Sequence, residues 1–198
     1  GGMLLTDEKN IADKARKWST QSRENAPWYQ HEEVGYNYRM SNVIAGVVRG
    51  QLLHLEEHIS RKKEIYERYK NGLKDLPVKM NPYDEKNSKP NFWLSCMIID
   101  KEAMCRQVRD DARALFLPEK GKSCPTEILE RLAEFNAEGR PIWKPMHMQP
   151  IYRNNGFVSV LGDVGSDIFD RGLCLPSDIK MTNEQQDTVI EIIRNCFE

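Results

Sequence analysis

The sequence lacks an excess of charge of either sign. Lys and Arg number 29 and Asp and Glu number 30, which leaves a formal net charge of −1. A chain without a global positive field is not drawn to nucleic acid or to an anionic membrane surface. We therefore expect neither nucleic acid nor a membrane as a partner.

Long apolar runs and paired cysteine motifs are also lacking. No run approaches the roughly 20 apolar residues that cross a bilayer, and residues 1–10 contain no basic segment followed by an apolar one. The five cysteines are odd in number and widely spaced, with no Cys-x-x-Cys pair. This pattern favours neither a disulfide framework nor a zinc ribbon. We predict a cytoplasmic protein whose cysteines are free thiols.

What is present is sufficient for a folded core. Hydrophobic residues make up 39% of the 198 residues and charged residues 30%, which argues against disorder. The length fits one ordinary domain, or about half of a larger protein with two lobes.

The first 40 residues read as a short strand, a helix and a loop. Met3 to Thr6 is predicted to be a strand that pairs with strands outside this sequence, because a lone strand leaves its edges unsatisfied. Ile11, Ala15 and Trp18 recur at helical spacing. Residues 20–36 are polar, aromatic and aperiodic, and they contain Pro27, so we predict a long loop.

One long helix is predicted over residues 41–75. Ser41 or Asn42 can cap it. Its apolar residues are spaced by three or four, namely Ile44, Val48, Leu52, Leu55, Ile59, Tyr66, Tyr69 and Leu73. Some 30 residues of helix span about 45 to 50 Å, so the two ends are expected to serve different bodies. We place the crossing at Lys62 and Lys63, which interrupt the apolar positions.

Residues 76–198 are predicted to form a compact α+β domain. Its predicted elements are a strand over Phe92–Ile99, a weak helix over Lys101–Phe116, a helix between Cys124 and Gly139, a strand over Pro141–Pro145, a helical turn over Asp167–Arg171, a strand over Leu173–Leu175 and a last helix. Thr182 and Gln185 form a capping box ahead of that last helix.

His54, Glu57 and His58 match the His-x-x-Glu-His pattern of inverted zinc peptidases. In the structural alternative, both histidines flank the core positions of a solvated helix. No third ligand can be identified downstream, so we assign no metal site. A cysteine nucleophile paired with His147 has no local activating group in the sequence.

Two stretches carry more information. Gly35 to Asn42 (GYNYRMSN) places two tyrosines, an amide and a guanidinium just before a helix N-terminus, where a phosphate would be well bound. Arg140 to Pro150 (RPIWKPMHMQP) is a proline-stiffened segment that presents cations and an indole, which suits a ligand with phosphates and a ring. From the residues alone, each stretch can also have a purely structural role. The first can be a helix entry whose arginine makes a surface salt bridge, and the second can be an edge strand.

These stretches, with Gly1 to Asp7 before them and Arg171 to Ser177 (RGLCLPS) after them, occur in an order that resembles the DegT-like family of pyridoxal-phosphate-dependent sugar-nucleotide aminotransferases. The family belongs to the fold-type I transaminases. The nearest likeness within it is to enzymes that aminate C4 of a UDP-linked 4-keto-6-deoxy sugar.

The resemblance implies an α/β protein, of which this chain is the carboxyl-terminal portion. Residues 1–40 would be a remnant of the large cofactor-binding domain with a substrate loop, 41–75 a long linking helix, and 76–198 a small α+β domain with an antiparallel sheet. In the family, the lysine that forms the Schiff base lies before the glycines that appear here as Gly1 and Gly2. We therefore expect no catalytic residue in this chain and no transamination by the chain alone.

The resemblance also assigns binding residues. Asn37 corresponds to the asparagine that reaches the cofactor phosphate of a neighbouring subunit, which implies a homodimer with shared active sites. The residues expected to contact the sugar nucleotide are Arg39, Trp143, Lys144 and His147, with Trp28, Tyr29 and His31 closing over it. The expected amino donor is glutamate. Residues 101–123 form a longer connection than the family leads us to expect.

A third possibility stays open beside the aminotransferase and the zinc peptidase. The chain could be a binding or structural module in which the same scaffold has no catalytic role.

Overall fold

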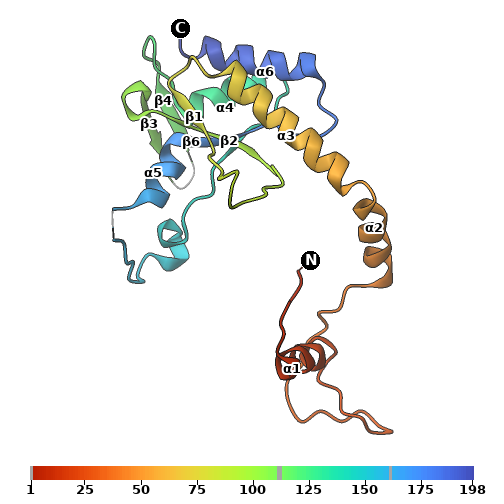
Figure 1. Cartoon of the computed structure of the whole chain (residues 1–198). Helices are drawn as coiled ribbons and strands as arrows, with labels where there is room; N and C mark the ends of the chain where they lie inside the picture. The colour runs from red at the N-terminus through yellow and green to blue at the C-terminus, as the bar shows by residue number, and fades with distance from the viewer. Residues whose placement is uncertain (1, 111–112, 161) are drawn as a thin grey trace. The chain divides into compact units, whose positions relative to one another are not determined.

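A computed structural model describes residues 2–110, 113–160 and 162–198 (Figure 1). The chain divides into two compact units, Gly1–Leu55 and Glu56–Glu198. Within the described residues, no helix combines the length and the apolar character that a bilayer crossing requires.

The first unit contains two helices and the loop between them. Helix α1 spans Lys9–Ser19 and helix α2 spans Asn42–Leu52. The hydroxyl of Ser41 accepts a hydrogen bond from the backbone N–H of Ile44 at 3.3 Å, so the predicted cap is confirmed.

Met3 to Thr6 is not a strand within this chain, and its predicted pairing with strands outside the sequence stays a prediction. These residues are irregular and exposed, with Met3 86% exposed. A strand needs a neighbour for its backbone hydrogen bonds, and no strand in the described parts of the chain pairs with this segment.

The predicted single helix over 41–75 is two helices. Helix α2 ends at Leu52 and α3 spans Leu55–Gly72. Between them, the backbone N–H of His54 donates to the carbonyl of Gln51 at 3.0 Å. This hydrogen bond joins residues three positions apart, as in a 3₁₀ turn, and not four apart as in an α-helix. The helical spacing of apolar residues continues through this break, but the burial of those residues differs between the two helices. Helix α2 buries no residue, whereas α3 buries Ile65, Tyr66 and Tyr69.

The second unit is built on a four-stranded antiparallel sheet, as predicted for the small domain. The strand order is β1 (Val78–Met80), β2 (Ser95–Ile99), β6 (Gly172–Leu175) and β5 (Arg140–Pro141). Strand β6 lies between two partners, with Cys174 opposite Cys96 on one side and opposite Arg140 on the other. All four residues of β6 are buried.

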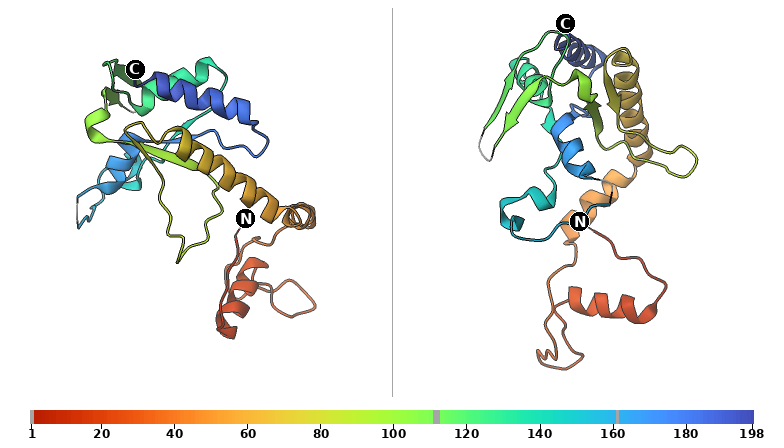
Figure 2. Two further views of the ribbon diagram at one scale, coloured as in Figure 1. Left: turned by 45° about the horizontal axis from the view of Figure 1, so that its top comes forward. Right: turned by 90° about the vertical axis from the view of Figure 1, so that its left-hand side faces the viewer.

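Helices α3, α4 (Pro125–Glu134) and α6 (Asn183–Asn195) contribute to the core with β2 and β6, and α3 and α6 run side by side (Figures 1 and 2). The least exposed members of this core are Ile65, Tyr69, Leu73, Ile99, Ile128, Leu132, Leu173 and Ile193. Pro125 at the start of α4 and the capping box of Thr182 and Gln185 at α6 are confirmed. Helix α5 (Val164–Arg171) leads directly into β6.

The predicted helix over Lys101–Phe116 is wrong. The structure has a short 3₁₀ turn, η1 (Lys101–Ala103), and then a two-stranded antiparallel sheet of β3 (Arg106–Arg109) and β4 (Ala114–Leu117); residues 111–112 lie outside the described parts. Tertiary contacts decide the outcome, because the guanidinium of Arg109 donates to the carbonyl of Phe169 at 2.9 Å and the amide of Gln107 donates to Asp170.

The strand predicted over Pro141–Pro145 is shorter than expected. Only Arg140 and Pro141 pair with β6, and the chain then enters two 3₁₀ turns, η2 (Met146–Met148) and η3 (Pro150–Tyr152). Proline has no N–H for a ladder, which limits pairing in this segment.

A single substitution tests which residues hold the second unit together. Leu132 on α4 is fully buried in the core, whereas Leu115 on β4 is 62% exposed. Leu132→Ala is expected to lower the free energy of unfolding by about 2 to 5 kcal/mol, because it leaves a cavity. Leu115→Ala is the matched control and is expected to change it by less than about 0.5 kcal/mol. Urea unfolding followed by circular dichroism measures both, and equal effects would contradict this core.

Candidate functional site

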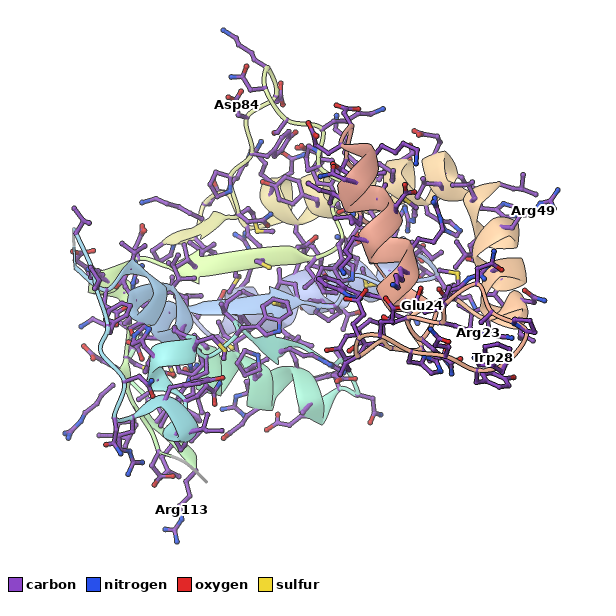
Figure 3. All side chains as sticks on the ribbon, turned by 90° about the horizontal axis from the view of Figure 1, so that it is seen from below. Arg23, Glu24, Trp28, Arg49, Asp84 and Arg113 are labelled. Atoms are coloured by element: carbon purple, nitrogen blue, oxygen red, sulfur yellow. The ribbon has the colours of Figure 1, made fainter. Side chains whose placement is uncertain are left out.

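The loop after α1 carries the aromatic residues that the resemblance assigns to substrate closure. The ring of Tyr29 lies 4.3 Å from the guanidinium carbon of Arg23, and the Trp28 indole N–H donates to the side-chain oxygen of Gln30 at 3.0 Å. His31 contacts the carbonyl of Gln21 through Nδ1 at 2.9 Å. Trp28 and Tyr29 are 64% and 75% exposed, so their rings are available to a ligand. Arg23, Glu24 and Trp28 are labelled in Figure 3.

Ion pairs with α1 hold the base of this loop. The carboxylate of Glu33 accepts hydrogen bonds from Lys14 at 2.6 Å and from the Trp18 indole at 2.9 Å, and it lies 3.3 Å from the ammonium of Lys17. Lys17 also pairs with Glu24 at 2.5 Å. The Lys14 hydrogen bond, supported by Trp18 and Lys17, lowers the pKa of Glu33 from its ordinary 4.5 to about 2.

Gly35 determines how the Tyr36-Asn37-Tyr38 segment approaches the end of α1. A Cβ on Gly35 would lie 2.2 Å from the backbone of both Gln21 and Ser22, which is too close for any other residue. Gln21 and Ser22 themselves have φ of 68° and 51°. The close approach lets Tyr36 N–H donate to the carbonyl of Trp18 at 2.7 Å and Tyr38 N–H donate to that of Ser19 at 3.0 Å.

Asn37 and Arg39 are exposed on this segment. Asn37 forms an antiparallel bridge with Thr20, and the rings of Tyr36 and Tyr38 on either side of it stack at 5.0 Å. Within the described residues, neither the Asn37 amide nor the Arg39 guanidinium makes a hydrogen bond or ion pair. An amide and a cation on a backbone fixed by hydrogen bonds can bind a phosphate.

In the second unit, Trp93 and Trp143 border a pocket of about 620 Å³ that we call the tryptophan pocket. Their ring centroids are 6.0 Å apart, and the rings are 64% and 62% exposed. The other polar and charged residues that line the tryptophan pocket are Lys62, Glu138, Arg140, Lys144, Ser177 and Asp178. Exposed indoles beside several cations suit a ligand that combines a ring with negative charge.

Lys62 fixes two walls of the tryptophan pocket to α3. Its ammonium donates to the carbonyl of Trp93 at 3.1 Å and to the carbonyl of Ser177. Burial lowers the pKa of Lys62, and the nearby carboxylate of Asp178 opposes that shift. From the sequence, Lys62 marked only the predicted crossing between two bodies. Its position among apolar helix residues is the signal for its partial burial.

Lys144 lines two hollows. One is the tryptophan pocket, and the other is a hollow of about 710 Å³ whose lining includes Arg109, Arg113 and Gln149. Arg140 and Pro141 pair with β6, and this pairing brings the following residues, including Lys144, to the two hollows. Pro145 then starts the η2 turn, which carries His147.

His147 belongs to a hydrogen-bonded cluster at the start of α5. Its Nε2 lies 2.7 Å from Asp163 and 3.3 Å from the hydroxyl of Ser166, and its ring stacks on Phe157 at 3.7 Å. Asp163 also caps α5 by accepting from the backbone N–H of Ser166 at 2.9 Å. Hydrogen bonds from Ser166, and then from His147, lower the pKa of Asp163. His147 is therefore paired with a carboxylate, a contact that no local sequence pattern predicts.

The zinc pattern does not assemble into a site. His54 precedes α3, whereas Glu57 and His58 lie in its first turn, so the helical spacing is interrupted. In the parts of the chain that the structure describes, no three His, Cys, Asp or Glu side chains are grouped to hold a metal ion.

The structure thus groups the predicted residues by unit. Trp28, Tyr29, His31, Asn37 and Arg39 lie on the 20–41 loop of the first unit. Trp143, Lys144 and His147 lie on the segment after β5 in the second. Four residues of the candidate site were not predicted from the sequence, namely Lys62, Trp93, Asp163 and Ser166.

Comparison with known proteins identifies the class. The model of the DegT/DnrJ/EryC1/StrS aminotransferase family matches residues 1–194, so the chain belongs to this family, as the ordered motifs indicated. The family is dependent on pyridoxal phosphate.

Individual relatives agree with this assignment. EpsN of Bacillus subtilis (strain 168) is 39% identical over all of this chain and 46% of its own length. GDP-perosamine synthase of Escherichia coli O157:H7 is 28% identical over all of this chain and 47% of its own. Among solved structures, the PLP-form of the putative sugar aminotransferase Spr1654 from Streptococcus pneumoniae has a similar fold, with a TM-score of 0.76 at 17% identity. The match covers 98% of this chain and 45% of the Spr1654 chain. The chain spans about half the length of the relatives it matches.

The Glu33 cluster leads to a prediction for acidic pH. Because the folded-state pKa of Glu33 is about 2 and its ordinary value is 4.5, its contribution to stability is present above pH 4.5 and is lost as the pH falls towards 2. Carbon-13 NMR titration of the Glu33 carboxyl should give a pKa near 2. Lys14→Gln should raise it, whereas Lys9→Gln on the same helix, which removes a pair with Asp13, should not. A Glu33 that titrates near 4.5 in the unaltered chain would contradict this geometry.

Proposed function

We propose that this chain supplies the substrate-facing part of a pyridoxal-phosphate-dependent aminotransferase that aminates a nucleotide-linked keto-deoxy sugar. The observation that carries the proposal is the family match across residues 1–194. When bound, the cofactor takes an amino group from a donor and passes it to the keto sugar. We propose glutamate as the donor.

For the cofactor, we propose that Asn37 contacts its phosphate. Two observations support the fit: the side chain is exposed and unpaired within the described residues, and its backbone is bridged to Thr20. An amide N–H on a fixed backbone can donate to a phosphate oxygen without a large ordering cost. We propose that this phosphate belongs to the cofactor of a second copy, in a homodimer.

For the sugar nucleotide, we propose that Arg39 pairs with the diphosphate in the first unit. In the second unit, we propose that Trp143 contacts a ring of the ligand and that Lys144 contacts its negative charge. The exposed indole and the cationic lining of the tryptophan pocket support these roles. Which nucleotide is bound can be tested with UDP- and GDP-linked sugars, since one relative is named for a GDP-linked product.

We propose lesser roles for the remaining predicted residues. His147 is held by Asp163 and Ser166, so we propose that it orients the segment of Trp143 and Lys144 and presents its ring to the sugar. Trp28, Tyr29 and His31 are proposed to cover the substrate. We also propose a cytoplasmic location for the protein.

A kinetic prediction concerns Arg39. In the natural protein, Arg39→Ala is expected to raise the KM for the sugar nucleotide about 10- to 100-fold, since it removes a charge-assisted hydrogen bond of roughly 1.5 to 3 kcal/mol. Arg49→Ala, another exposed arginine of the first unit, is the matched control and should leave KM within about twofold of the unaltered value. Steady-state kinetics with glutamate and each keto sugar measure both. Equal KM values for the two variants would contradict the role of Arg39.

A second prediction concerns the residue that holds the cofactor covalently. We propose that no lysine of this chain forms the Schiff base. Borohydride reduction of the cofactor-loaded natural protein, followed by peptide mapping, should therefore locate the pyridoxyl group outside residues 1–198. Stoichiometric label at Lys62, Lys144 or any other lysine of this chain would overturn the proposal, and a protein that takes up no cofactor would favour the non-catalytic module.

A further inference from the structure

Two cysteines face each other across the centre of the sheet. Cys96 on β2 and Cys174 on β6 are direct partners in the antiparallel register, and their sulfur atoms are 3.6 Å apart. Arg140 on β5 is the partner of Cys174 on its other side, so the three residues form one row across three strands. Within the described residues, neither cysteine is in a disulfide.

The backbone already has a spacing that a disulfide allows. Directly opposed residues of an antiparallel pair have Cα atoms about 4.5 or 5.5 Å apart, and both values fall within the range of roughly 4.4 to 6.8 Å found for disulfides. The sulfurs must approach from 3.6 Å to about 2.05 Å, which side-chain rotation can provide without separating the strands. Cys174 is 4% exposed, close to the 2% and 0% of Cys105 and Cys124, but it lines the tryptophan pocket, whereas Cys105 and Cys124 line neither this pocket nor the hollow beside Arg109.

Cys174 is only 4% exposed, but it lines the tryptophan pocket, and the local charges favour its reaction. Cys174 lines the tryptophan pocket, which has a volume of about 620 Å³. The hydrogen bond from Cys96, together with the guanidinium of Arg140, lowers the pKa of Cys174, whereas the same hydrogen bond and burial raise the pKa of Cys96. The thiolate is the nucleophilic form of cysteine, so the attack should start at Cys174.

We infer that Cys96 and Cys174 form a reversible dithiol–disulfide site, in which Cys174 is the cysteine that lines the tryptophan pocket. The oxidant is a low-molecular-weight disulfide such as oxidised glutathione. The thiolate of Cys174 attacks one sulfur of the oxidant and releases one glutathione thiolate; Cys96 then attacks Cys174 and releases the second. The two protein thiols lose two electrons and two protons, and the oxidant becomes two molecules of glutathione.

The test is oxidation of the natural protein, or of this chain, with oxidised glutathione, followed by alkylation and mass spectrometry. Before alkylation, the expected product is lighter than the reduced protein by two hydrogen atoms and returns to the reduced mass with dithiothreitol. After alkylation, its peptide map contains one peptide pair joined through Cys96 and Cys174. In Cys96→Ser, the reaction should stop with one glutathionyl group on Cys174. In Cys105→Ser, the matched control, the disulfide should form as in the unaltered protein.

Three results would overturn the inference. These are a stable glutathione adduct on Cys174 in the unaltered protein, a disulfide that joins either cysteine to Cys105, Cys124 or Cys196, and complete alkylation of both Cys96 and Cys174 after oxidation. Each is read directly from the peptide map of the unaltered protein and does not depend on how the variants fold.

Discussion

The second unit depends on the position of β6 between β2 and β5. Every residue of this strand is buried, and Leu173 and Leu175 pack in the core, where burial of each stabilises the fold by about 1.5 to 3 kcal/mol. Gly172 begins the strand because a Cβ there would lie 2.5 Å from the carbonyl of Ile168, so the α5-to-β6 junction requires glycine. After the strand, the Tyr69 hydroxyl donates to the carbonyl of Pro176 at 2.8 Å and Lys62 donates to that of Ser177. The chain is therefore fixed at both ends of β6.

The positions of the candidate site residues in the second unit depend on these contacts at the two ends of β6. Pairing of Arg140 and Pro141 with β6 directs the next residues, Trp143 and Lys144, towards the tryptophan pocket. Lys62 joins the opposite wall, at Trp93, to α3. The first unit has a separate constraint, since only glycine at position 35 lets the Asn37 segment lie against the end of α1. Residues that would bind ligand thus lie beside buried or hydrogen-bonded backbone, which limits the ordering cost of binding.

Local signals predicted much of the fold, and tertiary contacts decided the rest. The Thr182 and Gln185 box, Pro125 at the start of α4 and the apolar run ending at Ile99 act within a few residues, so the sequence is sufficient to read them. The β3–β4 pair was missed because Gln107 and Arg109 are held by residues some 60 positions away. The site shows the same division. Trp143 and His147 stand in a recognisable motif, whereas Trp93 and Asp163 come to them through folding, with no periodicity that marks them.

We propose that the two segments around Asn37 and Trp143 bind ligand rather than serve only as scaffold. Hydrogen–deuterium exchange of the natural protein, with and without a saturating UDP- or GDP-linked sugar, tests it most directly. Bound ligand should slow exchange at residues 35–40 and 140–148 and leave the core of α4 and α6 unchanged. Protection confined to the His54–His58 region, or no change in either segment at saturating ligand, would contradict it.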